Sequence, residues 1–555
     1  MLVNDKIWVA QGDVPCCLLL NQANRHGLIA GATGTGKTVT LKVLAEGFSE
    51  AGVPVFMADV KGDVTGMAQA GAMSDGLRKR LGYFGLSEDE VSFRGVPCRI
   101  WDMLGEGGCP VRVTISDMGP VLLSRLLGLT DVQQGVLNVV FRVADDQGML
   151  LLDLKDLRSM LTYVADHAKD YETTYGRVSS QSVGAIQRAL LAVEDQGGDV
   201  FFGEPNLDLN DWFACAEDGR GYVNILNAAK LIQTPQLYAM FLLWMLSTLF
   251  ETLPEVGDLD KPRFAFFFDE AHLLFDGMPK QLGDKIVQVV KLIRSKGVGV
   301  YFITQSPSDI PNEVLAQLNN RVQHGLRAYT PAEMKAVKAA AASFRDNPGF
   351  DEVAALQDLG TGEALVSFLD DEGRPSIAQR ARVIFPSCRM AAADPDVVEL
   401  VLAEEQDLYE KYGEAVDRES AYELIASARE TEAANAALAA ERAAFEKERA
   451  AFEAERAREA ARQAKAAEQA AARQQREREK AEQARLQRLE REAEAARKRQ
   501  QQAAAQAERK RQQEEERRRR ERAKTMTDVA GTLLTPVFGK TTGRKIARGL
   551  FGTKR

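Results

Sequence analysis

The sequence predicts an α/β protein, built on a mostly parallel sheet with a helical insertion and followed by a long charged α-helix. A glycine-rich motif near residue 31 separates an apolar run of strand length from a helical pattern. Apolar runs of that length then alternate with helical periodicities as far as about residue 390. From about residue 420 to 524 the chain is rich in Ala, Glu, Arg, Gln and Lys and contains neither Gly nor Pro, a composition that favours helix.

The glycine-rich motif matches the G-x-x-x-x-G-K-[ST] phosphate loop at every fixed position, between a strand expected at 26–30 and a helix expected at 39–46. In that context successive backbone N–H groups and the helix dipole point at a polyphosphate. Lys37 is expected to reach the β- and γ-phosphates of ATP, and Thr38 to ligate Mg²⁺. The residues expected to bind the nucleotide are Gly31, Ala32, Thr33, Gly34, Thr35, Gly36, Lys37 and Thr38.

The other elements of the α/β region follow from apolar periodicity. Two short apolar runs at 7–10 and 16–20 indicate a hairpin or edge strands. Helical periodicity from about 119 to 196 indicates an insertion within the sheet, and we assign residues 1–425 to one domain. Further strands are expected at 53–59, 97–102, 111–115, 221–226, 263–268, 297–305, 321–327 and 362–368, and helices at 237–253, 280–294 and 331–344.

Two carboxylates end the most apolar of the expected strands. Asp269 is expected to share Mg²⁺ with Thr38, at the tip of a strand beside the phosphate-loop strand. Glu270 is expected to orient or deprotonate the attacking water. Gln305 ends the following strand, where it can sense the γ-phosphate, and His272 is interpreted as a structural neighbour of the acidic pair. This combination predicts hydrolysis of ATP rather than transfer to a small acceptor.

Other charged residues extend the candidate site. Asp59 and Asp63 follow the strand at 53–59, and ligands gather at the carboxyl edge of a parallel sheet, so both are candidates for a second acidic position; a charged turn is the alternative. Ring ATPases draw an arginine from the neighbouring subunit to stabilise transition-state charge. The candidates are Arg294, Arg321 and Arg327, with a surface role as the alternative for each.

Together these motifs resemble those of the HerA/FtsK superfamily of hexameric translocase ATPases. The resemblance rests on residues 31–38, 59–63, 266–272 and 294–308 in that order, and covers about residues 1–425. Segments 24–29 and 321–324 are similar to the bacterial HerA-like branch, the YjgR-like group. The resemblance implies a RecA-like P-loop NTPase core, a homohexameric ring, ATP hydrolysis between subunits and a polymer threaded through the pore. It also implies that Arg294 acts in trans.

The resemblance leaves three functions open. The favoured one is a translocase or helicase-like motor on double-stranded DNA. The second is a protein-translocating or secretion-type motor, and the third is a nucleotide-gated scaffold whose long helix binds a partner protein. The chain shows no clear N-terminal β-barrel of the archaeal DNA-processing members and no membrane spans of the FtsK branch, so their particular roles are not carried over.

The net charge of −9 is unevenly distributed. Residues 431–523 and 524–555 carry about +6 each, which leaves about −21 on residues 1–430. An acidic head does not favour extensive nucleic-acid binding. Any contact of the head with DNA is therefore expected to be local, for example through loops that line a pore.

The last 130 residues divide into two segments. Residues 426–525 are expected to form a long charged helix or a weak coiled coil, because Leu438, Phe445 and Phe452 repeat every seven residues; disorder is the third option. The tail at 526–555 carries basic and apolar residues at helical spacing, which suits an anionic membrane surface, nucleic acid or a partner. Scattered cysteines without a C-x-x-C pair and the lack of a long apolar run predict a cytoplasmic protein without a zinc site.

Overall fold

The computed structural model describes residues 1–231, 234–257, 259–275 and 280–486. The chain divides into two compact units, Met1–Ala434 and Asn435–Arg555. The tail expected at 526–555 and the last part of the expected long helix lie outside the described residues. Among the helices that are described, none combines the length and apolarity needed to cross a membrane.

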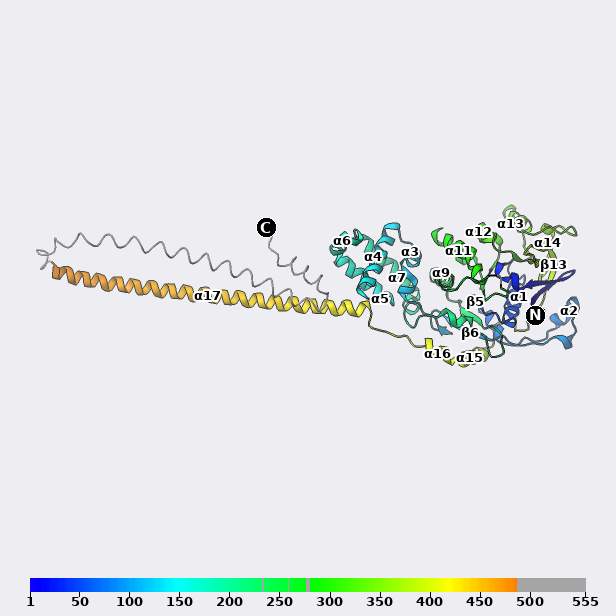
Figure 1. The fold of residues 1–555 in the computed structure, drawn as a ribbon, viewed down its shortest axis with the longest axis horizontal. Coiled ribbons are helices and arrows are strands. Elements are labelled where there is room, and N and C mark those ends of the chain that lie inside the picture. The colour runs from blue at the N-terminus through cyan, green and yellow to red at the C-terminus, as the bar shows by residue number, and fades with distance from the viewer. Residues whose placement is uncertain (232–233, 258, 276–279, 487–555) are drawn as a thin grey trace. The chain divides into compact units, whose positions relative to one another are not determined.

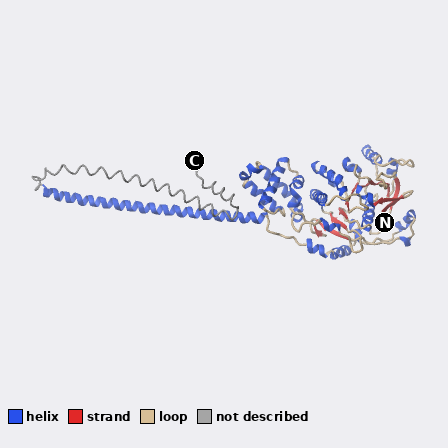
Figure 2. Ribbon diagram, viewed as in Figure 1, coloured by secondary structure: helices blue, strands red, loops and turns tan. Residues whose placement is uncertain are grey.

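The described strands of the first unit form one thirteen-stranded sheet (Figure 2) in the order β1-β2-β13-β12-β11-β4-β10-β9-β5-β8-β6-β7, with β3 paired to β2. Neighbours from β11 to β7 are parallel, and the others are antiparallel. The bounds are β1 Leu2–Val3, β2 Lys6–Gln11, β3 Pro15–Leu19, β4 Gly27–Ala30, β5 Val55–Asp59, β6 Cys98–Asp102, β7 Cys109–Pro110, β8 Val223–Asn227, β9 Phe264–Phe268, β10 Val298–Thr304, β11 Asn320–His324, β12 Glu363–Ser367 and β13 Gln379–Val383.

Helices cover both faces of the parallel half of the sheet, which explains why its strands are apolar throughout. Alternate residues of β9 face opposite layers. Phe264, Phe266 and Phe268 pack in one core with α9 (Pro235–Thr252) and α11 (Lys280–Ile293). Ala265 and Phe267 pack in another with α1 (Lys37–Glu50). The other helices of the α/β part include α2 (Asp75–Phe84), α13 (Pro331–Ala341), α14 (Glu352–Asp358), α15 (Pro395–Glu404) and α16 (Gln406–Tyr412).

A group of helices between β7 and β8 forms the insertion (Figure 1). It contains α3 (Ile115–Leu126), α4 (Asp131–Gln147), α5 (Leu154–Asp166), α6 (Ala168–Tyr175) and α7 (Ser180–Val193), and α3 packs on α9. The strand expected at 111–115 is wrong. Thr114 accepts a hydrogen bond from the Asp117 N–H at 3.1 Å and is the N-cap of α3 instead, because its side chain satisfies an N–H of the first turn that has no partner within the helix.

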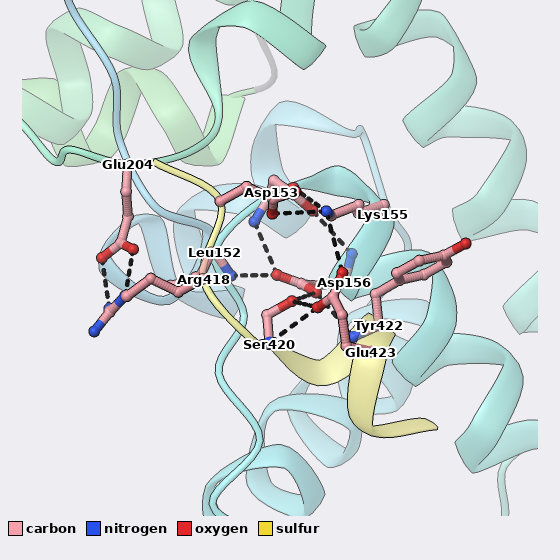
Figure 3. Close-up of polar contacts among 10 residues, drawn as sticks. Leu152, Asp153, Lys155, Asp156, Glu204, Arg418, Ser420, Tyr422 and Glu423 are labelled. Carbon is pink, nitrogen blue, oxygen red and sulfur yellow. Dashed lines mark hydrogen bonds and ion pairs between the residues drawn. The ribbon is translucent and has the colours of Figure 1, made fainter. Parts of the chain in front are cut away.

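The first turn of the long helix α17 (Ala421–Leu486) is anchored on the insertion (Figure 3). The Asp156 carboxylate on α5 is fully buried. It accepts hydrogen bonds from the Ser420 hydroxyl at 2.5 Å, the Tyr422 N–H at 3.0 Å and the Leu152 N–H at 2.8 Å. The Ala421 N–H donates to the Leu150 carbonyl at 3.0 Å. The insertion thus supplies partners for helix-end N–H groups that a free helix leaves unpaired.

Charged pairs surround this buried cap. Lys155 pairs with Asp417 at 2.8 Å and Glu423 at 3.3 Å, and Arg418 forms a two-bond pair with Glu204 at 2.6 Å (Figure 3). In the second unit, the described part of α17 is exposed to solvent. Leu438, Phe445 and Phe452 are 47%, 67% and 61% exposed, so the structure presents their seven-residue repeat on a single helix, and the coiled coil stays a prediction.

Candidate nucleotide-binding site

The phosphate loop, residues 31–38, joins β4 to α1 at the carboxyl edge of the parallel strands, as expected. Gly34 and Gly36 have φ values of +76° and +116°, a region that side chains with a Cβ rarely adopt. These two glycines turn the chain so that α1 begins at Lys37. The loop therefore points the N-terminus of a helix at its own concave side, the arrangement that binds phosphate.

His324, at the end of β11, supports the loop from below. A Cβ on Gly31 would lie 2.5 Å from the His324 Cβ, so only glycine fits there. The His324 Nδ1–H donates to the Glu363 carbonyl at 3.0 Å, and Nε2 accepts from the Thr40 hydroxyl at 2.8 Å. Burial lowers the pKa of this imidazole to about 4, so it is neutral. The sequence placed His324 in a family segment but gave it no role.

Lys37 lies inside the curve of its own loop. Its ammonium donates to the carbonyls of Gly31 at 2.6 Å and Ala32 at 3.1 Å. Burial and then the Lys61 charge lower the pKa of Lys37, while the carboxylates of Glu270 and Asp269 act in the opposite direction. The charges of the two carboxylates at the end of β9 thus act on the loop lysine.

Asp269 and Glu270 follow β9 and are both buried. Burial raises the pKa of Asp269 to about 6, and its Oδ1 accepts the Glu270 N–H at 2.9 Å. Burial would also raise the pKa of Glu270, but Lys61, Gln305 and His272 outweigh it and hold that pKa below its usual value. Glu270 has a φ of +48°, a costly conformation for a residue other than glycine that persists only where the surroundings enforce it.

The residues fit a magnesium ion that is shared with a nucleotide. No group of three or more His, Cys, Asp or Glu side chains in the described ranges could hold a metal alone. Mg²⁺ suits sites that supply one or two protein ligands and take the rest from phosphate and water. Asp269 is a desolvated carboxylate that a cation would stabilise, and Thr38 is the half-buried hydroxyl of the loop.

One part of the predicted geometry is wrong. The strand that ends at Asp269 is not beside the phosphate-loop strand, because β10 pairs with both β4 and β9 and separates them. Gln305, which follows β10, therefore lies between the loop and the acidic pair. Its Nε2 is 3.5 Å from the Glu270 Oε2, a long hydrogen bond. His272 also faces that oxygen, with its Nδ1 at 3.3 Å.

The charged segment after β5 contains a residue that sequence reasoning missed. Lys61 forms an ion pair with Glu270, Nζ to Oε1 at 2.6 Å. Asp59, a candidate for a second acidic position, instead accepts three backbone N–H groups of its own turn. The Asp63 Oδ1 is buried and has no hydrogen-bond partner among the residues that the structure describes. The signal available in the sequence was a lysine between two aspartates at the carboxyl edge of a strand.

The three candidate arginines occupy different positions in the fold. Arg321 is engaged within its own chain, where its guanidinium donates to the carbonyls of Leu318, Leu315 and Ser343. Arg327 is exposed and follows β11, at the edge where the phosphate loop lies. Arg294 is exposed and precedes β10, so it is at the opposite end of that strand from Gln305. Arg294 and Gln305 are thus separated by the length of β10 within the described part of the chain.

The fold and the site define a P-loop α/β protein with an acidic pair at the end of β9, on the same edge of the sheet as the phosphate loop. A family model described as "Helicase HerA-like C-terminal" matches residues 4–485. The chain belongs to this HerA-like family, so the expected superfamily and α/β fold are confirmed. The narrower YjgR-like assignment stays a prediction.

Individual relatives are more distant. A stretch of 120 residues is 31% identical to "Probable helicase MJECL08" of Methanocaldococcus jannaschii; it covers 21% of each chain, so the chain spans about a fifth of that relative. Among solved structures, plasmid coupling protein TrwB in complex with ADP and Mg²⁺ is 16% identical over 70% of this chain and 92% of its own, with a TM-score of 0.44. VirB4 of Thermoanaerobacter pseudethanolicus is 15% identical over 72% and 99%, with a TM-score of 0.44. These similarities are too low to support a comparison of function.

Proposed function

We propose that the chain is an ATPase of the HerA/FtsK type that binds ATP with Mg²⁺ and hydrolyses it. The observation that carries this proposal is the buried Glu270 carboxylate, which lies beside Asp269 and within the electrostatic reach of Lys37. A carboxylate in that position has the residue type and surroundings of a general base toward a water that attacks the terminal phosphate.

Each residue then has a definite task. The loop N–H groups of residues 31–38 and the Lys37 ammonium bind the phosphates. Thr38 and Asp269 would hold Mg²⁺, and the ion would supply positive charge toward the phosphate oxygens. Glu270 accepts the proton of the attacking water, and Gln305 orients that water or the terminal phosphate from the neighbouring strand.

We further propose a homohexameric ring that moves along double-stranded DNA. Two observations support Arg294 as the arginine that acts in trans: it is exposed, and it lies at the far end of β10 from Gln305. The charge of about −21 on residues 1–430 favours the second candidate, a ring that moves protein. A nucleotide-gated scaffold is the third. In each case we propose that the long helix binds a partner protein and that the tail binds a membrane surface or nucleic acid. We propose a cytoplasmic location for the protein.

The test is the ATPase rate of the full chain with and without double-stranded DNA, compared with Glu270→Gln. We expect the wild type to hydrolyse ATP and Glu270→Gln to bind ATP normally but to turn it over at least about a hundredfold more slowly. Stimulation by DNA supports the DNA motor, and turnover that DNA leaves unchanged favours the protein motor. If the wild type binds ATP without hydrolysing it, the proposed ATPase function is contradicted and the nucleotide-gated scaffold is the candidate that remains.

A further inference from the structure

The turn that presents Lys61 is held by hydrogen bonds of its own. The buried carboxylate of Asp59 accepts hydrogen bonds from the N–H groups of Gly62 at 2.7 Å, Val64 at 3.0 Å and Thr65 at 3.2 Å. Gly62 has a φ of +78°, which closes the turn directly after the lysine. The backbone on both sides of Lys61 is thereby fixed.

The same turn is tied to the helix that follows the phosphate loop. Lys42 on α1 is fully buried, and its ammonium donates to the Asp63 carbonyl at 2.7 Å, as well as to the carbonyls of Arg389 at 2.9 Å and Met390 at 3.0 Å. A buried ammonium retains these bonds because losing one leaves a charge without a partner. The Lys61 turn and α1 therefore form one rigid support.

From this support Lys61 reaches the general-base candidate. Its Nζ lies 2.6 Å from the Glu270 Oε1, and the other oxygen faces the Nδ1 of His272 and the Nε2 of Gln305. Both carboxylate oxygens are engaged, so Lys61 helps to set where Glu270 points. The Lys61 side chain is 42% exposed and that of Glu270 only 8%. Lys61 can therefore leave the pair toward solvent or a ligand without disturbing the core.

We propose that Lys61 pairs with Glu270 when no nucleoside triphosphate is bound and transfers to the terminal phosphate when one binds. The inference rests on the proposed ATPase function. The Lys61 charge lowers the pKa of Lys37, and a polyphosphate bound by both lysines would relieve that repulsion. A triphosphate offers Lys61 more negative charge than one carboxylate does. A diphosphate lacks the terminal group and leaves Lys61 on Glu270.

Lys61 would therefore distinguish a bound triphosphate from a bound diphosphate. A ligand shifts such an equilibrium only through contacts that differ between the two states, and here the difference is one ammonium–phosphate contact. Removal of the lysine should weaken binding of ATP but not of ADP. Removal of Lys61 should also release Glu270 from the ion pair in every state of the protein. The rate at which bound ATP is hydrolysed should therefore not fall.

The experiment uses the full chain as wild type, Lys61→Met, Lys61→Arg and Lys79→Met, the last being an exposed lysine of α2. Affinities for fluorescent ATP and ADP analogues are measured by titration, and bound ATP is followed through a single turnover. For Lys61→Met we expect the ratio of ATP to ADP affinity to fall about tenfold, with a single-turnover rate at least equal to that of the wild type. Lys61→Arg should restore the ratio, and Lys79→Met should match the wild type.

Two results would overturn the inference. An unchanged affinity ratio in Lys61→Met would show that the ion pair with Glu270 is only structural. A single-turnover rate that falls tenfold or more would show that the chemical step needs the ion pair between Lys61 and Glu270, so that Lys61 does not simply transfer to the terminal phosphate. Both differ from failure of the proposed function, in which the wild type itself binds or hydrolyses no ATP and both proposals fall together.

Discussion

Two buried histidines hold the phosphate-loop strand as neutral imidazoles. His26 directly precedes β4; its Nε2–H donates to the Val290 carbonyl at 2.9 Å, and its Nδ1 accepts the Val300 N–H at 3.0 Å. His324 supports the loop on the other side. Burial lowers the pKa of both from 6.5 to about 4. Their neutral form is therefore part of what keeps the loop in place.

These histidines predict a loss of stability in acid. Between about pH 6.5 and pH 4 the unfolded chain binds protons that the folded chain refuses, so the free energy of unfolding falls as the pH is lowered through this window. The loss amounts to at most about 3 kcal/mol for each histidine. Chemical denaturation of the wild type and His26→Gln at several pH values should show that the free energy of unfolding changes less with pH in the variant. Equal slopes would contradict this reading of His26.

At the scale of single residues the sequence identified the motif residues of the site but not the residue that pairs with Glu270. Lys37, Asp269, Glu270 and Gln305 were recognisable because each is a fixed position of a local motif. Lys61 was not, because its partner Glu270 lies more than two hundred residues further along the chain. A local pattern carries no information about a partner at that distance.

At the scale of elements, strands buried on both faces were predictable and the others were less so. Unbroken apolar runs identified β5, β9 and β10, since both sides of each strand are covered. β13 was missed because its alternating residues, Gln379 to Val383, are stabilised by pairing with β12 and β2. The order of parallel strands also lay beyond local pattern, which is why β10 was not expected between β4 and β9.

The anchor of α17 on α5 gives a prediction at this scale. Asp156→Ala removes a fully buried acceptor from the N–H groups of Tyr422 and Leu152. We expect the free energy of unfolding to fall by about 2–4 kcal/mol, and hydrogen exchange to quicken at the first amides of α17. Asp166→Ala, which breaks the exposed pair with Arg429 on the same two helices, is the control and should cost at most about 1 kcal/mol. Equal effects of the two changes would mean that the buried cap is not the main attachment.

At the scale of the whole molecule, the separation of Arg294 from its own site makes the ring testable. Subunits that carry Arg294→Ala keep an intact loop, and subunits that carry Lys37→Ala keep the arginine. In an equal mixture about a quarter of the interfaces would combine an intact loop with a neighbour's arginine. ATPase activity should therefore reappear on mixing, up to about that fraction of the wild-type rate.

A second mixture serves as the control for this experiment. Lys37→Ala and Glu270→Gln damage the same site from within one subunit, so no interface in their mixture is complete and activity should stay absent. Absence of recovery in the Arg294→Ala mixture as well would show that Arg294 does not act between subunits. Recovery in both mixtures would show instead that subunits do not share sites in the way proposed.

The buried cap at Asp156 also dictates where the polypeptide can be shortened. A version that stops before Ser420 would strip the carboxylate of two donors and uncover the apolar surface that Ala421 and Ile425 fill. A version that stops after Ala434 removes the solvent-exposed shaft and keeps every one of these contacts. The first turns of α17 thus belong to the compact unit Met1–Ala434, although their composition matches that of the rest of the helix.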